Sequence, residues 1–194
     1  MIRPSTWRDS LLAAALLLLS VPARAGEQRL LLEPATTRVT FTLGATLHTA
    51  EGSIRLDRGE LRFDPETGAV SGEIVLDAKS AETGSESRDA NMRRDVLESE
   101  RFPYVKFRPE KLEVLRRDDT TAEVRLVGGL ELHGESRPFT IPAQLVRKGD
   151  RMAISSSFRV PYVDWNVRDY SNFVLRVDRF VDVTVEADGK LAAP

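Results

Sequence analysis

The stretch TRVTFTLGATLH, residues 37–48, places an apolar side chain at every second position. Val39, Phe41 and Leu43 hold three of these positions, and threonine or another small or polar residue stands between them. Successive side chains of a β-strand point to opposite faces. The pattern therefore predicts a strand with one face for a core and one face for water.

The same two-residue period recurs along most of the chain. Further strands are expected over 70–76, 112–116, 122–132, 138–146, 153–160 and 180–186. Segments rich in Gly, Pro and Asp predict turns at 64–68, 118–119, 133–134 and 148–150, and a hairpin turn at 57–59. At the third of these turns His133 precedes Gly134, and both residue types tolerate unusual backbone angles.

One segment lacks the alternation. Residues 87–98 are rich in Arg, Asp and Glu, and they predict a short helix that is capped by Ser87 or Asp89 and ends before Pro103. About eight short strands with one inserted helix indicate an all-β fold, either a closed antiparallel barrel or a sandwich. We expect one domain, residues 26–194.

The N-terminus has the features of an export signal. Arg3 and Arg8 precede an unbroken apolar run over residues 11–19, and Ala23 and Ala25 supply the small side chains that a signal peptidase requires. The apolar run is shorter than the ~20 residues of a membrane-spanning helix. We predict a signal peptide over residues 1–25, cleavage after Ala25, and a periplasmic or secreted protein without a membrane span.

Charge and cysteine content exclude several classes of partner and stabilisation. Removal of residues 1–25 leaves 25 basic and 29 acidic side chains, a net charge of −4, and no basic cluster for nucleic acid is present. The chain has no cysteine, so an exported protein of this sequence has neither disulfides nor thiolate metal ligands. Its stability must come from a hydrophobic core.

Five blocks of the sequence follow one another in a recognisable order. They are Phe41–Leu43 with Leu47, His48 and Gly52; Gly59–Asp64; Ser87–Arg93 followed by Phe102–Phe107; Gly129–Gly134 with Pro138; and Val160–Trp165 with Leu175–Val177. In this order the blocks resemble the YceI-like family. The similarity spans nearly the whole predicted mature chain.

The resemblance implies a lipocalin-like barrel of eight antiparallel strands around an apolar tunnel. It also implies binding of a polyisoprenoid lipid, such as a quinone or a prenyl phosphate, in the periplasm. A polyprenyl tail has no polar atoms, so the tunnel needs apolar walls and a few polar groups at its mouth. We expect the walls to include Phe41, Leu43, Phe63, Tyr104, Phe107, Phe158, Trp165, Phe173 and Leu175. The alternative is that these side chains pack together and fill the barrel.

Two polar residues are candidates for the tunnel mouth. Arg88, which stands beside Asp89, is a candidate contact for a lipid head group, and the alternative is a structural cap or ion pair. His48 ends the first alternating strand and is a candidate at the mouth, against the alternative of an ordinary strand-end histidine.

An enzyme is disfavoured. The two histidines lack the spacing of a metal site, and no nucleophile elbow or phosphate-binding glycine loop is present. We therefore expect no metal and no cofactor apart from a bound isoprenoid lipid or quinone. The alternative function is an interaction module, for example in an envelope stress response, with a filled barrel and no ligand. A homodimer is compatible with either function.

Overall fold

The computed structural model of the protein describes residues 26–46, 49–169 and 176–192. Its strands are β1 (Gln28–Leu32), β2 (Arg38–Leu43), β3 (Ala50–Phe63), β4 (Val70–Glu82), β5 (Tyr104–Arg117), β6 (Thr121–Leu132), β7 (Glu135–Lys148), β8 (Arg151–Val160) and β9 (Val181–Ala192). Its helical elements are η1 (Pro34–Thr36), α1 (Glu86–Asn91), η2 (Met92–Val96) and η3 (Tyr162–Trp165). The predicted signal peptide, residues 1–25, lies outside the described residues.

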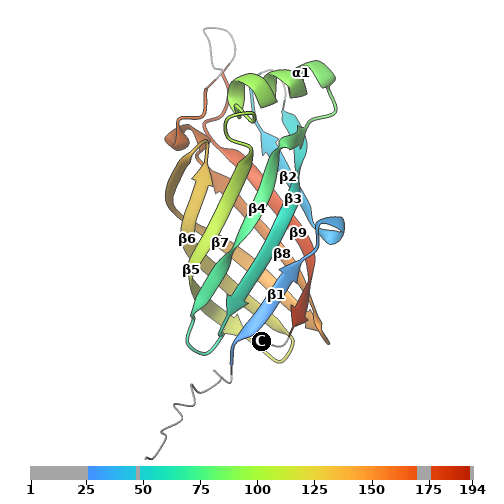
Figure 1. Cartoon of the computed structure of the whole chain (residues 1–194), viewed down its shortest axis with the longest axis vertical. Helices are drawn as coiled ribbons and strands as arrows, with labels where there is room; N and C mark the ends of the chain where they lie inside the picture. The colour runs from blue at the N-terminus through green and yellow to red at the C-terminus, as the bar shows by residue number, and fades with distance from the viewer. Residues whose placement is uncertain (1–25, 47–48, 170–175, 193–194) are drawn as a thin grey trace, which may run out of the picture.

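The strands form a closed barrel. From β3 to β9 each strand pairs antiparallel with the next, and β1 and β2 both pair with β3 on one side and with β9 on the other. β1 and β2 therefore share one position, so the barrel has eight strand positions (Figure 1). The predicted all-β, eight-stranded antiparallel barrel is confirmed.

The shared position is split at Pro34. Proline has no main-chain N–H and cannot continue a ladder as donor, and residues Pro34–Thr36 form the 3₁₀ turn η1. β3 pairs with β1 from Gly59 onward and with β2 up to Ile54. Residues 55–58 of β3 thus have no partner in either of these two ladders, and the barrel wall is interrupted there.

The predicted hairpin turn at 57–59 is wrong. These residues lie inside β3, where the ladder to β4 shifts its register between Leu56 and Arg58. One extra residue at such a bulge reverses the alternation of the faces. In a regular strand, two residues five positions apart lie on opposite faces. Because of the bulge, Leu56 and Leu61 can both be buried.

Other predicted turns are confirmed. Gly68 and Gly149 have φ of 74° and 66°, in the turns after β3 and β7. His133 and Gly134 have φ of 52° and 80° between β6 and β7, which are the angles of a tight hairpin that favours glycine and tolerates histidine.

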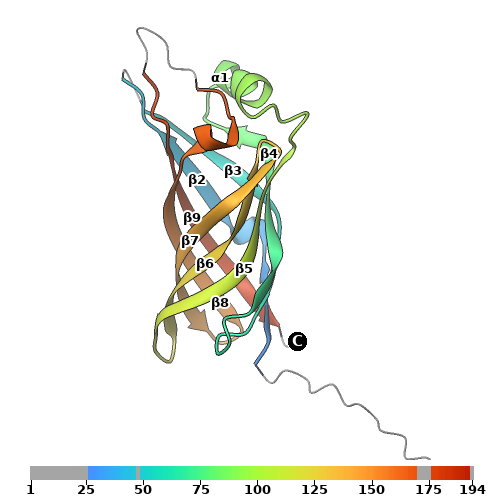
Figure 2. The same ribbon diagram turned by 90° about the vertical axis from the view of Figure 1, so that its left-hand side faces the viewer.

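The predicted helix is present, but its predicted cap is wrong. α1 begins after Ser85, whose side chain makes no capping hydrogen bond, and continues as the π-helical turn η2. The Asp89 carboxylate instead accepts hydrogen bonds from the main-chain N–H and the hydroxyl of Thr83. The helix lies over one end of the barrel, and the C-terminal end of β9 lies at the other (Figures 1 and 2). Among the described residues, no helix has both the length and the apolar character required to cross a bilayer.

Three clusters of buried apolar side chains line the inner face of the sheet. The first, near the helix end, contains Phe107, Leu130, Val160, Tyr162, Trp165 and Val167. The second contains Leu30, Leu61 and Met152, and the third contains Leu112, Val124 and Ala143. The alternation that predicts each strand therefore also supplies this core.

The ladder between β7 and β8 is short. It joins only Gln144–Lys148 to Arg151–Ser155. Pro138 and Pro142 lack the N–H donors that a longer ladder to β8 would use, and the Ser156 hydroxyl donates to the Pro142 carbonyl instead. Side chains, not main-chain pairs, close the barrel wall at this seam.

Candidate functional site

The candidate site is the apolar interior of the barrel near the helix end. Four of the predicted wall residues meet there: Leu43, Phe107, Phe158 and Trp165 all belong to the first cluster or pack against it. They come from β2, β5, β8 and η3, which are distant in sequence. The barrel brings them together because each lies on the inner face of its own strand or loop.

Trp165 closes the seam between β7 and β8. Its side chain is 2% exposed, and its indole N–H donates to the Leu130 carbonyl at 2.9 Å. The Phe139 ring lies edge-on to both Trp165 and Phe158, with centroid distances of 6.1 and 5.7 Å. Edge-to-face aromatic pairs of this kind add stability beyond the area they bury. Trp165 is therefore a structural part of the wall.

Phe41 lies on the inner face of β2 and is half-buried. It pairs in register with Val183, which packs against the first cluster, and with Gly52. A β-carbon built at Gly52 would come within 2.4 Å of the Phe41 ring. The ring thus occupies the space that the missing side chain of Gly52 leaves free.

Phe63 lies in the other half of the barrel. It packs against the second and third clusters, far along β3 from the helix end. Leu126 packs against all three clusters and is only partly buried. Leu43, Phe63, Phe107, Phe158 and Trp165 therefore belong to one continuous apolar interior, with Leu126 near its middle.

Tyr104 lies on the outer face, so its prediction as a wall residue is wrong. It alternates with Val105 and Phe107, which face the interior, and its side chain is 39% exposed. The Arg58 guanidinium lies 5.9 Å from the centre of its ring. The aromatic character of Tyr104 suggested a wall residue, but its position in the period of β5 places it outside.

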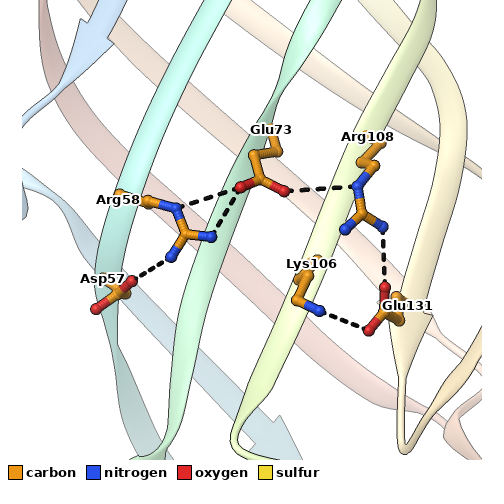
Figure 3. A network of polar contacts seen from close by, with 6 residues as sticks. All are labelled: Asp57, Arg58, Glu73, Lys106, Arg108 and Glu131. Carbon is orange, nitrogen blue, oxygen red and sulfur yellow. Dashed lines mark hydrogen bonds and ion pairs between the residues drawn. The ribbon is translucent and has the colours of Figure 1, made fainter.

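A network of charged side chains covers the same outer face (Figure 3). Glu73 forms ion pairs with Arg58 at 2.8 Å and with Arg108 at 3.5 Å, and Arg108 continues to Glu131 at 2.9 Å. Lys106 also pairs with Glu131 at 2.8 Å. The network joins β3, β4, β5 and β6, and it spans the ladder of four residue pairs between β4 and β5.

Hydrogen bonds within this network shift two pKa values. Donation from Lys106 and Arg108 lowers the pKa of the Glu131 carboxyl, with Lys106 as the larger cause. The bond to Glu73 is the main reason why the pKa of Arg58 is raised. Both shifts favour the charged forms, so the network stabilises the wall at neutral pH.

Arg88 makes its contacts within the protein. Its guanidinium donates to the hydroxyl and the carbonyl oxygen of Thr83, at 2.6 and 3.1 Å. The Thr83 hydroxyl in turn donates to Asp89, which lowers the pKa of that carboxyl. These bonds tie α1 to the end of β4. A contact between Arg88 and a head group remains a prediction.

Three further candidates lie outside the described residues. They are His48, predicted at the tunnel mouth, and the predicted wall residues Phe173 and Leu175.

Several interior residues were missed by sequence reasoning. Phe139, Ile141, Leu126 and Leu132 all pack against the first cluster. They stand at alternate positions of predicted strands, so the period itself could have found them. Trp165 was found as an apolar residue, but the acceptor of its N–H at Leu130 has no signature in the sequence.

Three polar side chains of the interior donate hydrogen bonds to the main chain. The Tyr162 hydroxyl donates to the Asp178 carbonyl at 2.8 Å, and burial raises the pKa of Tyr162. The Ser156 hydroxyl and the Trp165 N–H also donate to carbonyl oxygens. In the described part of the chain, no group of three or more His, Asp or Glu side chains is arranged to hold a metal ion. Near these three residues the interior therefore presents hydrocarbon, because their polar groups are already engaged.

The sequence model of the YceI-like domain family matches residues 31–189. A UPF0312 protein of Vibrio vulnificus is 24% identical over 194 residues, which cover 94% of this chain and 98% of that protein. A UPF0312 protein of Vibrio cholerae is 24% identical over 139 residues, covering 68% of this chain and 69% of that protein.

Solved structures share the barrel. BcnA of Burkholderia cenocepacia superposes with a TM-score of 0.66 at 16% identity, covering 84% of this chain and 99% of that chain. A polyisoprenoid binding domain from Saccharophagus degradans, implicated in plant cell wall breakdown, superposes with a TM-score of 0.62 at 18% identity, covering 86% and 98%. At these identities the likeness establishes a common fold.

Proposed function

Because the chain belongs to the YceI-like domain family, we propose that it binds a long isoprenoid lipid, of the quinone or polyprenyl phosphate type, inside its barrel. The protein would act in the periplasm, after removal of residues 1–25, as a carrier or buffer for a lipid that water does not dissolve. A polyisoprenoid binding domain shares its fold. We propose binding and transport, not catalysis.

The partial burial of Leu126 carries this proposal. In a solidly packed interior a side chain at the meeting point of three clusters would lose its exposure entirely. Leu126, Leu145 and Ile154 all point inward and pack between clusters, yet all three are only partly buried. The barrel wall surrounds them, so we infer that the accessible area faces space inside the barrel.

The chemistry of the wall fits a hydrocarbon tail. The interior hydroxyl and indole groups already donate to main-chain carbonyls, so they have no need of a polar ligand. A buried tail of isoprene units needs only apolar contact. At ~0.8 kcal/mol per buried CH₂, one five-carbon unit gains on the order of 3 kcal/mol before the cost of ordering the tail.

The length of the barrel fits several such units. β3 has 14 residues, which at about 3.3 Å per residue and a strand tilt of about 40° give a barrel roughly 35 Å long. We place the opening at the helix end, where η3 and α1 lie (Figure 2). The head group would remain near this end, outside the hydrocarbon interior.

Native mass spectrometry of the protein purified from its own periplasm tests the proposal. We expect an adduct whose mass and fragments identify an isoprenoid lipid, and we expect organic extraction to remove it. An interaction module with a filled barrel would carry no adduct in any preparation, and it would not take up an added polyprenol. That outcome would overturn the proposed function.

A further inference from the structure

The seam between β7 and β8 lacks a main-chain ladder over the part nearest the helix end. Both strands are described over their whole length, and the ladder between them ends at the pair Gln144 and Ser155. Beyond that pair, β7 still pairs with β6 as far as Glu135, and β8 still pairs with β9 as far as Val160. In this part of the wall, each strand is therefore held by main-chain bonds on its far side only.

Two prolines keep this part of the seam unpaired. The Pro142 carbonyl points toward β8, where it accepts a hydrogen bond from the Ser156 hydroxyl. In an antiparallel strand the nitrogen and the carbonyl oxygen of one residue point to the same side. Pro142, and Pro138 four residues before it, therefore present to β8 a nitrogen that carries no hydrogen. A regular ladder cannot form on such an edge.

Side chains supply the contacts across this part of the seam. Besides the hydrogen bond of Ser156, the Phe139 ring of β7 meets the Phe158 ring of β8 edge-on, with centroids 5.7 Å apart. At the helix end, the side-chain amide of Asn166, which follows η3, donates to the Glu135 carboxylate. Separation of β7 from β8 here breaks these contacts. Separation of two strands joined by a complete ladder breaks a pair of main-chain hydrogen bonds at every second residue.

The seam is also an uncharged strip of the barrel wall. Residues 138–144 (PFTIPAQ) and 152–158 (MAISSSF) include no charged side chain. The Arg159 guanidinium, next along β8, pairs with Asp182 of β9, on the side away from the seam. The outer face of β3–β6, in contrast, carries the charged network of Figure 3. A hydrocarbon tail that crosses between β7 and β8 therefore desolvates no charge, which would be costly.

On its inner side, the seam borders the interior that we propose as the lipid site. Phe139, Ile141 and Phe158 pack against the first cluster, and all three are only partly buried. A tail that passed between the strands would thus meet apolar side chains directly behind them.

We propose that β7 and β8 separate along this seam, and that an isoprenoid tail enters and leaves the barrel sideways between them. The inference rests on the proposed function and adds the route of the lipid. Because the seam extends to the helix end, the polar head group stays in water while the tail crosses the wall. A tail that entered only through the helix end would have to thread along the barrel one unit at a time.

A reversible cross-link across the seam tests this route. The chain has no cysteine, so Thr140→Cys/Ser157→Cys introduces two thiols, one at an exposed position on each side of the seam. A short bifunctional methanethiosulfonate reagent joins them, and a reductant releases them. The matched control Ser157→Cys/Thr184→Cys keeps the thiol at position 157 but joins it to β9, where Thr184 is its partner in register.

The cross-link is made either before or after the protein is loaded with polyprenol. Made before loading, the seam cross-link should slow polyprenol uptake at least about tenfold, as expected when an opening step controls access. Made after loading, it should slow release of the lipid to vesicles by a similar factor, whereas a cross-link that merely distorted the barrel would hasten release. Reduction should restore both rates, and the control cross-link should change neither.

Two results would overturn the sideways route. They are exchange of lipid at the wild-type rate by the protein with the seam cross-linked, and equal slowing by the seam and control cross-links. Either result leaves the binding of lipid itself standing, with the tail entering at the helix end. A wild-type protein that takes up no polyprenol would overturn the proposed function, and the route with it.

Discussion

Glu98 and His133 both have left-handed backbone angles, and their side chains meet. Their φ values are 44° and 52°, and Glu98 Oε1 lies 3.2 Å from His133 Nε2. The imidazole also lies against the Phe102 ring, with centroids 4.4 Å apart. Glu98 follows η2, and His133 is in the β6–β7 turn. The contact therefore fastens the segment after the helix to the barrel.

Replacement of His133 tests this fastening. His133→Ala should lower the free energy of unfolding by about 2 kcal/mol, because it removes the hydrogen bond and the ring contact and leaves an alanine at a left-handed position. His133→Asn should cost about half as much, since asparagine tolerates that backbone angle. Urea unfolding measures both values. Equal losses in the two variants would show that the left-handed backbone angle of residue 133 does not favour asparagine over alanine.

The charged network on the outer wall predicts a dependence on acid. The folded pKa of Glu131 is below the ordinary glutamate value of about 4.3. Its contribution to stability is thus present above that value and is lost as the pH falls through the folded pKa. Glu131→Gln should cost about 1 kcal/mol at pH 7, and the difference from the wild type should shrink below pH 4.

Urea unfolding at pH 7, 5 and 3 measures this difference. Glu100→Gln is the matched control, because Glu100 pairs with Lys79 but its side chain is 90% exposed, and exposed pairs contribute little. We expect no measurable effect of Glu100→Gln at any of the three pH values. A difference for Glu131→Gln that stays constant from pH 7 to pH 3 would contradict the assigned role of its charge.

The two-residue period predicted most of the fold because it indicates both where a strand lies and which of its side chains face the core. It failed where the period is broken. At Leu56–Arg58 a bulge continues the strand through residues that have the composition of a turn. At Pro34 a 3₁₀ turn divides one strand position into β1 and β2. Bulges and breaks depend on pairing with neighbouring strands, which no local pattern encodes.

The candidate site was predicted less completely than the fold. Phe107, Phe158 and Trp165 were found because large apolar residues at inward positions are buried. Tyr104 was wrongly predicted as a wall residue because its aromatic character was given more weight than its position in the strand. It lies three residues before Phe107, and its side chain therefore points to the opposite face. The acceptor of the Trp165 N–H, the Leu130 carbonyl, was not found, because the contact between them depends on the tertiary structure.

Thr37→Val should stabilise the protein. Valine has nearly the same shape as threonine, and it removes a buried hydroxyl that has no partner. We expect a gain of about 1 kcal/mol in the free energy of unfolding without ligand. Thr36→Val is the control, and it should destabilise because its hydroxyl donates to Asp188. A loss of stability in Thr37→Val would show that water already satisfies the hydroxyl.

Phe41→Glu should abolish binding of the isoprenoid. It places a carboxylate on the inner face of β2, where a hydrocarbon tail would desolvate it at high cost. Tyr104→Glu introduces the same charge on the outer face, so it should bind lipid as the wild type does. Adduct mass and polyprenol uptake are the measurements, with circular dichroism to confirm folding. Retention of lipid by folded Phe41→Glu would show that the tail does not pass this residue.

Leu126→Phe tests whether the middle of the barrel is empty. If the interior holds space, the larger ring fits, the free energy of unfolding changes by less than about 1 kcal/mol, and the uptake of long polyprenols falls several-fold because the ring blocks the tail. If the interior is solid, the same substitution overpacks it and costs roughly 1–3 kcal/mol. Leu115→Phe, on the exposed surface, should change neither quantity. Strong destabilisation of Leu126→Phe, together with no lipid bound to the wild type, would support a filled barrel. Close-packed side chains and a lipid tail cannot occupy the same volume.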